Sequence, residues 1–302
     1  MCSASITMAA PPELAPCVSS LWWSANAGGP ADADEHVLPT GQMHLVLRLS
    51  GPPVQLWPGT DGAAPQTLHG PLLGGARSSY YRKRASTTGT AMGALLGPGA
   101  AMALFGVDAG ELAHGHTPLA DLWGPDAQRL QEQILAARGP CAQLAVLTAF
   151  LSRRLAHTRP PPEPVRQALA MLRQGQSVAQ AVGRSGCSHR ALLAQFRQAT
   201  GLTPKALTQV WRMQHTLEAL RSDAATSLAE LAHDCGFSDQ AHLTRAFHAY
   251  AGVTPQHYRR LAPRHGNHIV LAGAAGQISS IRRDTAALSC ALPATTGASH
   301  GS

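Results

Sequence analysis

Residues 227–247 read SLAELAHDCGFSDQAHLTRAF, and residues 177–196 read SVAQAVGRSGCSHRALLAQF. The two stretches are copies of one pattern, displaced by 50 residues up to a shared glycine and by 51 residues after it. The matched pairs are Ser177 and Ser227, Gln180 and Glu230, Gly186 and Gly236, Phe196 and Phe247, Gly201 and Gly252, Thr203 and Thr254, and Pro204 and Pro255. So many matches in one order indicate an internal repeat.

Each copy predicts a helix, a tight turn and a second helix. Ser-x-x-Gln/Glu is a capping box, which begins a short helix, and the glycine permits a positive φ in the turn that follows. The second helix is expected to begin near Ser188 in one copy and near Ser238 in the other. Thr-Pro then begins a further helix, with threonine as N-cap and proline in the first turn. This order is the helix-turn-helix plan of DNA-binding proteins.

The second helix of the second copy has an apolar side and a polar side. Leu243, Phe247 and Tyr250 share the apolar side and are expected in the core. The polar side alone would fit a solvated surface, but two copies in a basic domain favour contacts to base edges. The polar side carries the predicted DNA-contact residues Asp239, Gln240, Ala241, Thr244, Arg245 and His248. Ser238, where this helix is expected to begin, is predicted to contact DNA as well.

Basic residues are concentrated in the part of the chain that holds the repeat. The 302 residues carry a formal net charge of +7. Residues 1–162 hold 10 basic and 10 acidic side chains, whereas residues 163–264 hold 12 and 6, a balance of +6. A basic block of domain size is typical of proteins that bind a polyanion.

The chain is expected to have an α+β fold with two domains. Residues 1–123 read as short strands between Gly/Pro turns, which indicates a β-rich sensor or dimerisation domain. Residues 124–159 have helical periodicity and are expected to form a helical connector. A proline-rich segment then introduces residues 160–263, an all-α DNA-binding domain with two helix-turn-helix units. Residues 264–302 are rich in Gly, Ala and Ser and are expected to be a disordered tail.

Residues 164–261 closely resemble the C-terminal DNA-binding domain of AraC/XylS-type transcription regulators. The resemblance rests on residues 227–247 and on GVTPQHYRR at residues 252–260. It implies seven helices, with residues 206–220 as a long helix that holds the two units about one DNA turn apart. Both recognition helices would then enter successive major grooves. Base-facing positions of the family's second unit fall here on Gln240, Ala241, His242, Thr244 and Arg245.

The first unit departs from the family's pattern. Its base-facing positions fall on Arg190, Leu193 and Ala194, of which only Arg190 is an obvious base reader. Gly183 weakens the first helix of this unit, because glycine costs about 1 kcal/mol relative to alanine in a helix. We therefore expect the second unit to carry most of the sequence specificity. The first is expected to position the domain, with His189, Arg190 and Arg197 near phosphates.

The N-terminal half resembles a poorly characterised β-rich module found in such regulators. The similarity is carried by VLPTG at residues 37–41, GPGA at residues 97–100 and PLADLWG at residues 118–124. The resemblance implies a sensing or dimerising role and no known ligand.

Signals for other chemistry are weaker. His114 and His116, or His36 and His44, could offer imidazoles to a metal, but no carboxylate–histidine array completes the set. Cys17 could be a reactive thiol, although a buried cysteine is commoner, and residues 82–84 (RKR) are expected to form a solvated turn. The sequence contains no nucleophile elbow, Walker A loop or dinucleotide fingerprint. We therefore expect no enzymatic activity, no metal and no cofactor.

The sequence predicts a sequence-specific DNA-binding transcription regulator. Its expected partners are double-stranded DNA, the transcription machinery and, through the N-terminal domain, a small-molecule effector or a second copy of the chain. The N-terminus lacks the pattern of a signal peptide and no apolar stretch is long enough to span a bilayer, so we expect a cytoplasmic protein without a membrane partner. The alternatives are an enzyme or DNA-repair protein with the same DNA-binding module, or a regulator whose N-terminal half only dimerises.

Overall fold

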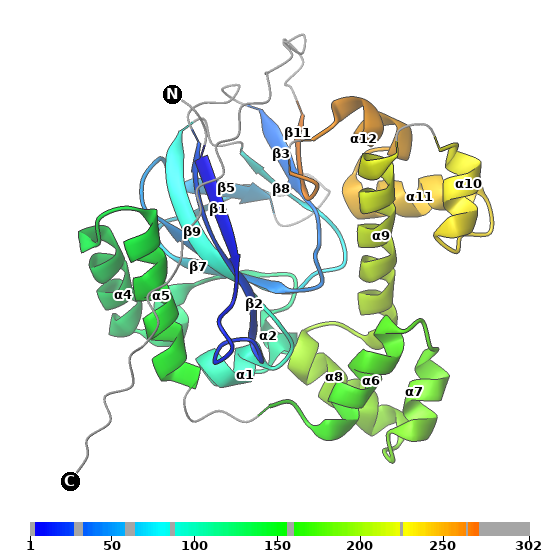
Figure 1. The fold of residues 1–302 in the computed structure, drawn as a ribbon, viewed down its shortest axis with the longest axis horizontal. Helices are drawn as coiled ribbons and strands as arrows, with labels where there is room; N and C mark the ends of the chain where they lie inside the picture. Colours follow the sequence, from blue (N-terminus) through cyan, green and yellow to red (C-terminus); the bar gives the residue numbers. More distant parts are fainter. Residues whose placement is uncertain are drawn as a thin grey trace.

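A computed structural model describes residues 4–26, 33–57, 64–84, 88–155, 160–223, 226–263 and 265–271. The N-terminal part is built on strands, and two helices, α4 and α5, lie on one side of it (Figure 1). The C-terminal helices lie on the opposite side, along the long helix α9. The predicted α+β class, with a β-rich N-terminal region and a helical C-terminal region, is confirmed.

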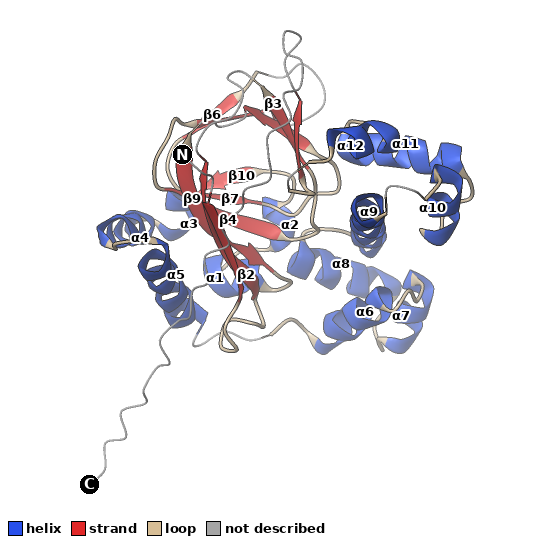
Figure 2. Cartoon of the chain, turned by 45° about the horizontal axis from the view of Figure 1, so that its top comes forward, coloured by secondary structure: helices blue, strands red, loops and turns tan. Residues whose placement is uncertain are grey.

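The strands form two antiparallel sheets, which appear in red in Figure 2. In spatial order the first sheet contains β1 (Ala4–Ala9), β2 (Val18–Asn26), β9 (Gly89–Leu96), β4 (Met43–Arg48), β7 (Leu72–Gly74) and β10 (His116–Pro118). The second contains β11 (His268–Leu271), β3 (Asp34–Val37), β8 (Tyr81–Arg84), β5 (Val54–Trp57) and β6 (Gln66–Leu68).

Strand β4 forms as its alternating sequence predicts. Met43, Leu45 and Leu47 are buried on one face, while the residues between them are half-buried. Its neighbour β9 approaches closely at Gly93, where a Cβ atom would lie 2.0 Å from the carbonyl oxygen of Leu45. A residue other than glycine would therefore separate these two central strands.

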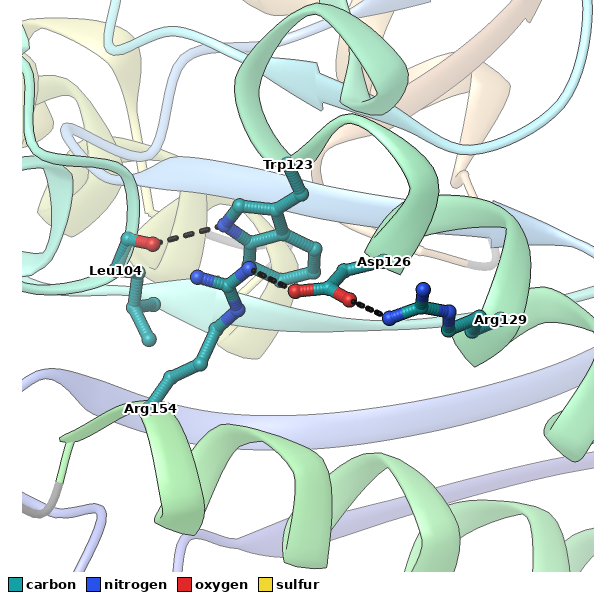
Figure 3. A network of polar contacts seen from close by, with 5 residues as sticks. All are labelled: Leu104, Trp123, Asp126, Arg129 and Arg154. Carbon is teal, nitrogen blue, oxygen red and sulfur yellow. Dashed lines mark hydrogen bonds and ion pairs between the residues drawn. The ribbon is translucent and has the colours of Figure 1, made fainter.

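Five helices accompany the sheets: α1 (Ala100–Phe105), α2 (Ala109–Leu112), α3 (Leu119–Trp123), α4 (Pro125–Ala136) and α5 (Pro140–Leu155). The indole of Trp123 donates to the carbonyl of Leu104 at 2.8 Å, and Asp126 accepts from Arg154 at 3.0 Å and from Arg129 at 2.9 Å (Figure 3). The Arg154 guanidinium also lies 4.6 Å from the centre of the Trp123 ring. These contacts join α3, α4 and α5 to one another and to α1.

The expected connector helices pack against the sheet. Trp23 on β2 donates from its indole to the side chain of Gln143 on α5 at 2.9 Å. Leu144, Leu147 and Leu151 on α5 are fully buried. The helices therefore add a layer to the N-terminal region, and the division into connector and domain at residue 124 stays a prediction.

The C-terminal region holds seven helices within residues 160–263, apart from the undescribed residues 224–225. They are α6 (Glu163–Arg173), α7 (Val178–Arg184), α8 (His189–Thr200), α9 (Pro204–Ser222), α10 (Leu228–Asp234), α11 (Gln240–Ala251) and α12 (Pro255–Leu261). The predicted long helix is α9, whose 19 residues span about 28 Å at 1.5 Å per residue. One helix-turn-helix unit lies at each end of it (Figure 1).

Two expectations for single segments are wrong. Residues 268–271, placed in a disordered tail, form β11, which pairs with β3 because HIVL is apolar enough to complete a sheet edge. Residues 272–302 lie outside the described residues. The RKR run, expected as a solvated turn, forms half-buried strand β8, where the Lys83 ammonium lies 3.1 Å from the Glu35 carboxylate.

Among the described residues, no helix combines the length and the apolar character needed to cross a bilayer.

Candidate nucleic-acid interface

The first helix of each unit begins at the predicted capping box. Ser227 Oγ accepts from the backbone N–H of Glu230 at 3.2 Å, and the Glu230 carboxylate accepts from the Ser227 N–H at 3.0 Å. In the first unit, Ser177 and Gln180 make the same two bonds at 3.2 and 2.8 Å. The two helices α7 and α10 therefore start in the same way.

The turns of the two units differ by one residue. Gly186 and Gly236 both have positive φ, at +67° and +73°, as the turn requires. Helix α8 is capped by Ser188, whereas α11 is capped by Asp239, which accepts from the His242 N–H at 2.7 Å. Ser238 is therefore the extra residue of the second turn, and it accounts for the change of offset from 50 to 51.

Helix α11 is the predicted recognition helix of the second unit. Leu243, Phe247 and Tyr250 are buried as predicted. Four of the predicted contact residues extend from its exposed side: Gln240, Ala241, Arg245 and His248. In Figure 1 the N-terminal end of α11 lies on the outer side of the molecule, beside α10, and its C-terminal end faces the N-terminal region.

Other predicted contact residues have partners within the unit. The His242 ring packs edge-on against Phe237 at 5.3 Å, and its Nδ1 lies 3.1 Å from the Ser238 hydroxyl. The Thr244 hydroxyl donates to the carbonyl of Gln240 at 2.9 Å. Asp239 caps the helix, and its bond from the His242 N–H lowers the pKa of this carboxyl. These side chains shape the start of the helix. Gln240, Ala241, Arg245 and His248 are the exposed residues within α11 that the sequence predicts to contact bases.

Helix α8 presents a less polar exposed side. His189, Arg190 and Ala194 are exposed, whereas Leu193 is half-buried. Arg197 is exposed, but its side chain runs past Gly110 of the N-terminal region, where a Cβ atom would lie 3.3 Å from Arg197 Cγ. Arg197 is therefore as much an interdomain residue as a candidate phosphate contact.

Sequence reasoning missed the residues that join the helical region to the N-terminal region. The side-chain amide of Gln214 on α9 lies 2.6 Å from the carbonyl of Pro39, 2.8 Å from the Tyr250 hydroxyl and 2.8 Å from the Asn267 side chain. Tyr250 donates to the same Pro39 carbonyl. A glutamine on a long helix gives no sequence signal for such a role.

The candidate metal-binding histidines have other partners. His36 lies against Ala251, with Nδ1 2.9 Å from its carbonyl, and His44 lies 2.9 Å from the Thr40 hydroxyl. Burial, together with the charge of the nearby Arg77 guanidinium, lowers the pKa of His44 to about 4 and that of His116 to about 3. No three His, Cys, Asp or Glu side chains gather as metal ligands in the part of the chain that the structure describes.

Two family models match the chain. One, described as a helix-turn-helix domain, matches residues 181–261, and the other, a domain of unknown function (DUF6597), matches residues 6–118. The HTH-type transcriptional activator RhaR of Escherichia coli (strain K12) is 31% identical over 77 residues, which is 26% of this chain and 27% of RhaR. The C-terminal part of this chain is an AraC-type helix-turn-helix domain. The predicted resemblance is thereby confirmed for the AraC-type domain, and the poorly characterised N-terminal module is the domain of unknown function.

The sequence match to RhaR covers about a quarter of each chain. This chain spans about a quarter of the length of the curated relatives it matches. Among solved structures, ToxT from Vibrio cholerae is 11% identical, with a TM-score of 0.44 over 79% of this chain and 98% of ToxT. A transcriptional regulator with an AraC-type domain from Chromobacterium violaceum is 20% identical, with a TM-score of 0.31 over 33% of this chain and 93% of that chain.

Proposed function

We propose that this protein is a sequence-specific DNA-binding transcription regulator of the cytoplasm. Its AraC-type domain would place α8 and α11 in successive major grooves on one face of the duplex. The second unit would supply most of the base contacts, and the first would position the domain on the phosphates.

One observation carries this proposal: two exposed recognition helices lie at the two ends of one helix, α9, in a domain of net positive charge. A span of about 28 Å for α9 is close to the 34 Å of one DNA turn. Proteins that neutralise phosphates with arginine gain affinity by releasing counterions, and the balance of +6 in residues 163–264 fits that role.

The experiment that tests the proposal is selection of binding sites from random duplex DNA with the full chain at two salt concentrations. A recovered motif about two DNA turns long supports sequence-specific regulation. Binding that weakens with salt but yields no motif contradicts it, because phosphate contacts alone carry no sequence information.

Arg245 is the side chain most suited to reading a guanine. We expect Arg245→Ala to weaken binding to the selected motif by about 1–3 kcal/mol and to relax one base position. The matched control is Arg166→Ala. Arg166 lies on α6, outside both helix-turn-helix pairs, and its substitution removes the same charge from the same domain. Competition with motif variants, each altered at one base pair, measures the effect. Equal losses for the two variants would contradict a base-reading role of Arg245.

A small-molecule effector, a second copy of the chain and the transcription machinery are further partners in this proposal. The contacts of the N-terminal region with α9 and α11 support a route by which such a partner could change DNA binding. A thermal-shift screen of small metabolites tests for an effector, and sedimentation at several protein concentrations tests for a dimer.

The enzyme alternative is not favoured by the environment of its best candidate nucleophile. Cys17 is buried, and burial raises the pKa of its thiol, so that the reactive thiolate is disfavoured at neutral pH. We expect Cys17→Ala to leave DNA binding unchanged.

A further inference from the structure

The N-terminal region binds α8 and α11 at equivalent positions, in each case through a backbone carbonyl of the helix. The carbonyl of Ala199 on α8 accepts from the N–H of Gly99 at 2.8 Å, and the carbonyl of Tyr250 on α11 accepts from the N–H of Tyr80 at 3.1 Å. Ala199 and Tyr250 are separated by 51 residues, the offset that relates α8 to α11. They are therefore equivalent positions of the repeat, each in the last turn of its helix.

A second contact strengthens each of these backbone bonds. Beside Ala199, the Gln198 amide donates to the Asp108 carboxylate at 2.7 Å. Beside Tyr250, His36 Nδ1 lies 2.9 Å from the Ala251 carbonyl, and the His36 ring stacks on Tyr80 at 4.3 Å.

The glycine that ends each recognition helix is in close contact with the N-terminal region. A Cβ atom at Gly201 would lie 2.9 Å from the Ala109 carbonyl oxygen, and one at Gly252 would lie 2.5 Å from the Tyr80 ring. Between the two ends, Gly41 approaches Leu207 of α9 so closely that a Cβ atom would lie 2.7 Å from it. The N-terminal region thus contacts α8, α9 and α11 in turn.

We infer that these contacts form a bracket that fixes the distance and orientation between α8 and α11, and so sets the spacing between the two half-sites that the protein accepts in DNA. By the bracket we mean the contacts of Gly99 and Asp108 with α8, and those of His36, Pro39 and Tyr80 with α11. This inference rests on the proposed function, because spacing has meaning only for a protein that reads two half-sites.

The bracket leaves the DNA-facing ends of the helices open. It contacts only the last turns, whereas Ser188, Asp239 and Gln240 at the first turns are exposed. Helix α9 ends at Ser222 and α10 begins at Leu228, and α9 contacts the second unit through Gln214, whose amide lies 2.8 Å from the Tyr250 hydroxyl. The bracket adds a further attachment for the last turn of α11, through Tyr80, His36 and Pro39.

The bracket is tested in the full chain without DNA by measuring the distance between α8 and α11. Spin labels are introduced as encoded unnatural amino acids at Ala194 and Ala241, which are exposed on the two helices, and electron–electron double resonance gives the distance distribution. We expect one narrow distance for the labelled parent chain. Gly201→Ala and Gly252→Ala, which insert a methyl group into the two ends of the bracket, should broaden it or add a second distance.

Gly175→Ala is the matched control. Gly175 has a φ of +79°, close to the +80° of Gly201 and the +73° of Gly252, but no atom lies within 4 Å of its Cβ position. It therefore imposes the same backbone strain without touching the bracket. Tyr250→Phe is a milder variant that keeps the ring and removes the hydroxyl bond to Pro39. An unchanged distribution in all bracket variants, or equal broadening in Gly175→Ala, would overturn the inference.

The consequence for DNA is tested with the selected motif and with versions lengthened or shortened by one base pair between its halves. One base pair changes the separation by about 3.4 Å, and we expect the parent chain to lose affinity on the order of tenfold or more, a factor of ten being 1.4 kcal/mol. The same change of spacing should cost the bracket variants less affinity than it costs the parent chain, and it should cost Gly175→Ala as much as the parent. A selection that returns no motif contradicts the proposed function, while the label distances still test the bracket. A motif whose spacing penalty is equal in all chains contradicts only the role of the bracket.

Discussion

Side chains of the two recognition helices differ in whether they already contact residues of their own unit or are exposed to solvent. On α11, His242 and Thr244 already contact their own unit, while Arg245 and His248 are exposed. The sequence predicted all of them as DNA contacts, because it does not show which polar side chains of a helix form hydrogen bonds with their neighbours. The structure separates them only through local contacts such as the Ser238 hydroxyl beside His242.

Leu193 on α8 gives a residue-scale prediction about the weaker unit. It is half-buried and apolar, so it offers at most a van der Waals contact to a thymine methyl. We expect Leu193→Ala to change the selected motif less than Arg245→Ala does. Selection from the same random library with each variant measures this, with thermal melting to correct for any loss of stability. A larger change for Leu193→Ala would mean that the first unit reads more of the sequence than the second.

At the scale of elements, local sequence predicted the helices of the AraC-type domain well. Capping boxes, the turn glycines and the Thr-Pro helix starts depend on residues within four positions of one another, and all of them formed. Strand β11 was missed because HIVL is short and its partner β3 lies more than 200 residues earlier in the chain, although the turn residues Gly266 and Asn267 directly precede it. Pairing over such a distance leaves no local pattern.

The capping box of α10 predicts a measurable contribution to stability. Ser227→Ala removes the acceptor for the Glu230 N–H, and we expect a loss of about 1 kcal/mol in the free energy of unfolding. Urea denaturation followed by circular dichroism measures it. Ser222→Ala serves as the control, since Ser222 is an exposed serine in the last turn of α9. If both substitutions cost the same, the box does not stabilise the helix start.

At the scale of the whole molecule, the charge pair that joins β11 to the second sheet makes stability depend on pH. Glu35 on β3 is paired with Lys83 on β8 and His268 on β11, and Asp34 and Arg82 lie on the neighbouring positions. Burial raises the pKa of Glu35, but Lys83 and His268 outweigh it and lower the pKa from 4.5 to about 2.

The folded pKa lies below the unfolded value, so this carboxylate stabilises the fold above about pH 4.5, and that stabilisation is lost as the pH falls towards 2. A shift of this size corresponds to roughly 3 kcal/mol. We expect Glu35→Gln to flatten the pH dependence of unfolding in this window, and Glu132→Gln, on the exposed side of α4, to leave it unchanged. Urea melts between pH 2 and pH 6 measure both.

The relation between the two halves of the molecule could not be predicted from sequence. The bracket uses backbone N–H groups, such as those of Gly99 and Tyr80, which every residue except proline carries. The position at which the chain divides stays a prediction, and contacts made by backbone N–H groups leave no residue type by which a sequence could reveal them. The sequence identified Gly252 as a position of the repeat, but only the structure shows its close contact with Tyr80.

Strand β11 has a consequence for how the chain is made. A ribosome delivers the chain from its N-terminus, and domains generally fold in that order as they emerge. Here the second sheet of the first domain lacks its edge strand until the residues after the AraC-type domain have been synthesised. During that interval β3 is an open edge, which can pair with other chains. The half of the protein that is translated first is therefore the half that finishes folding last.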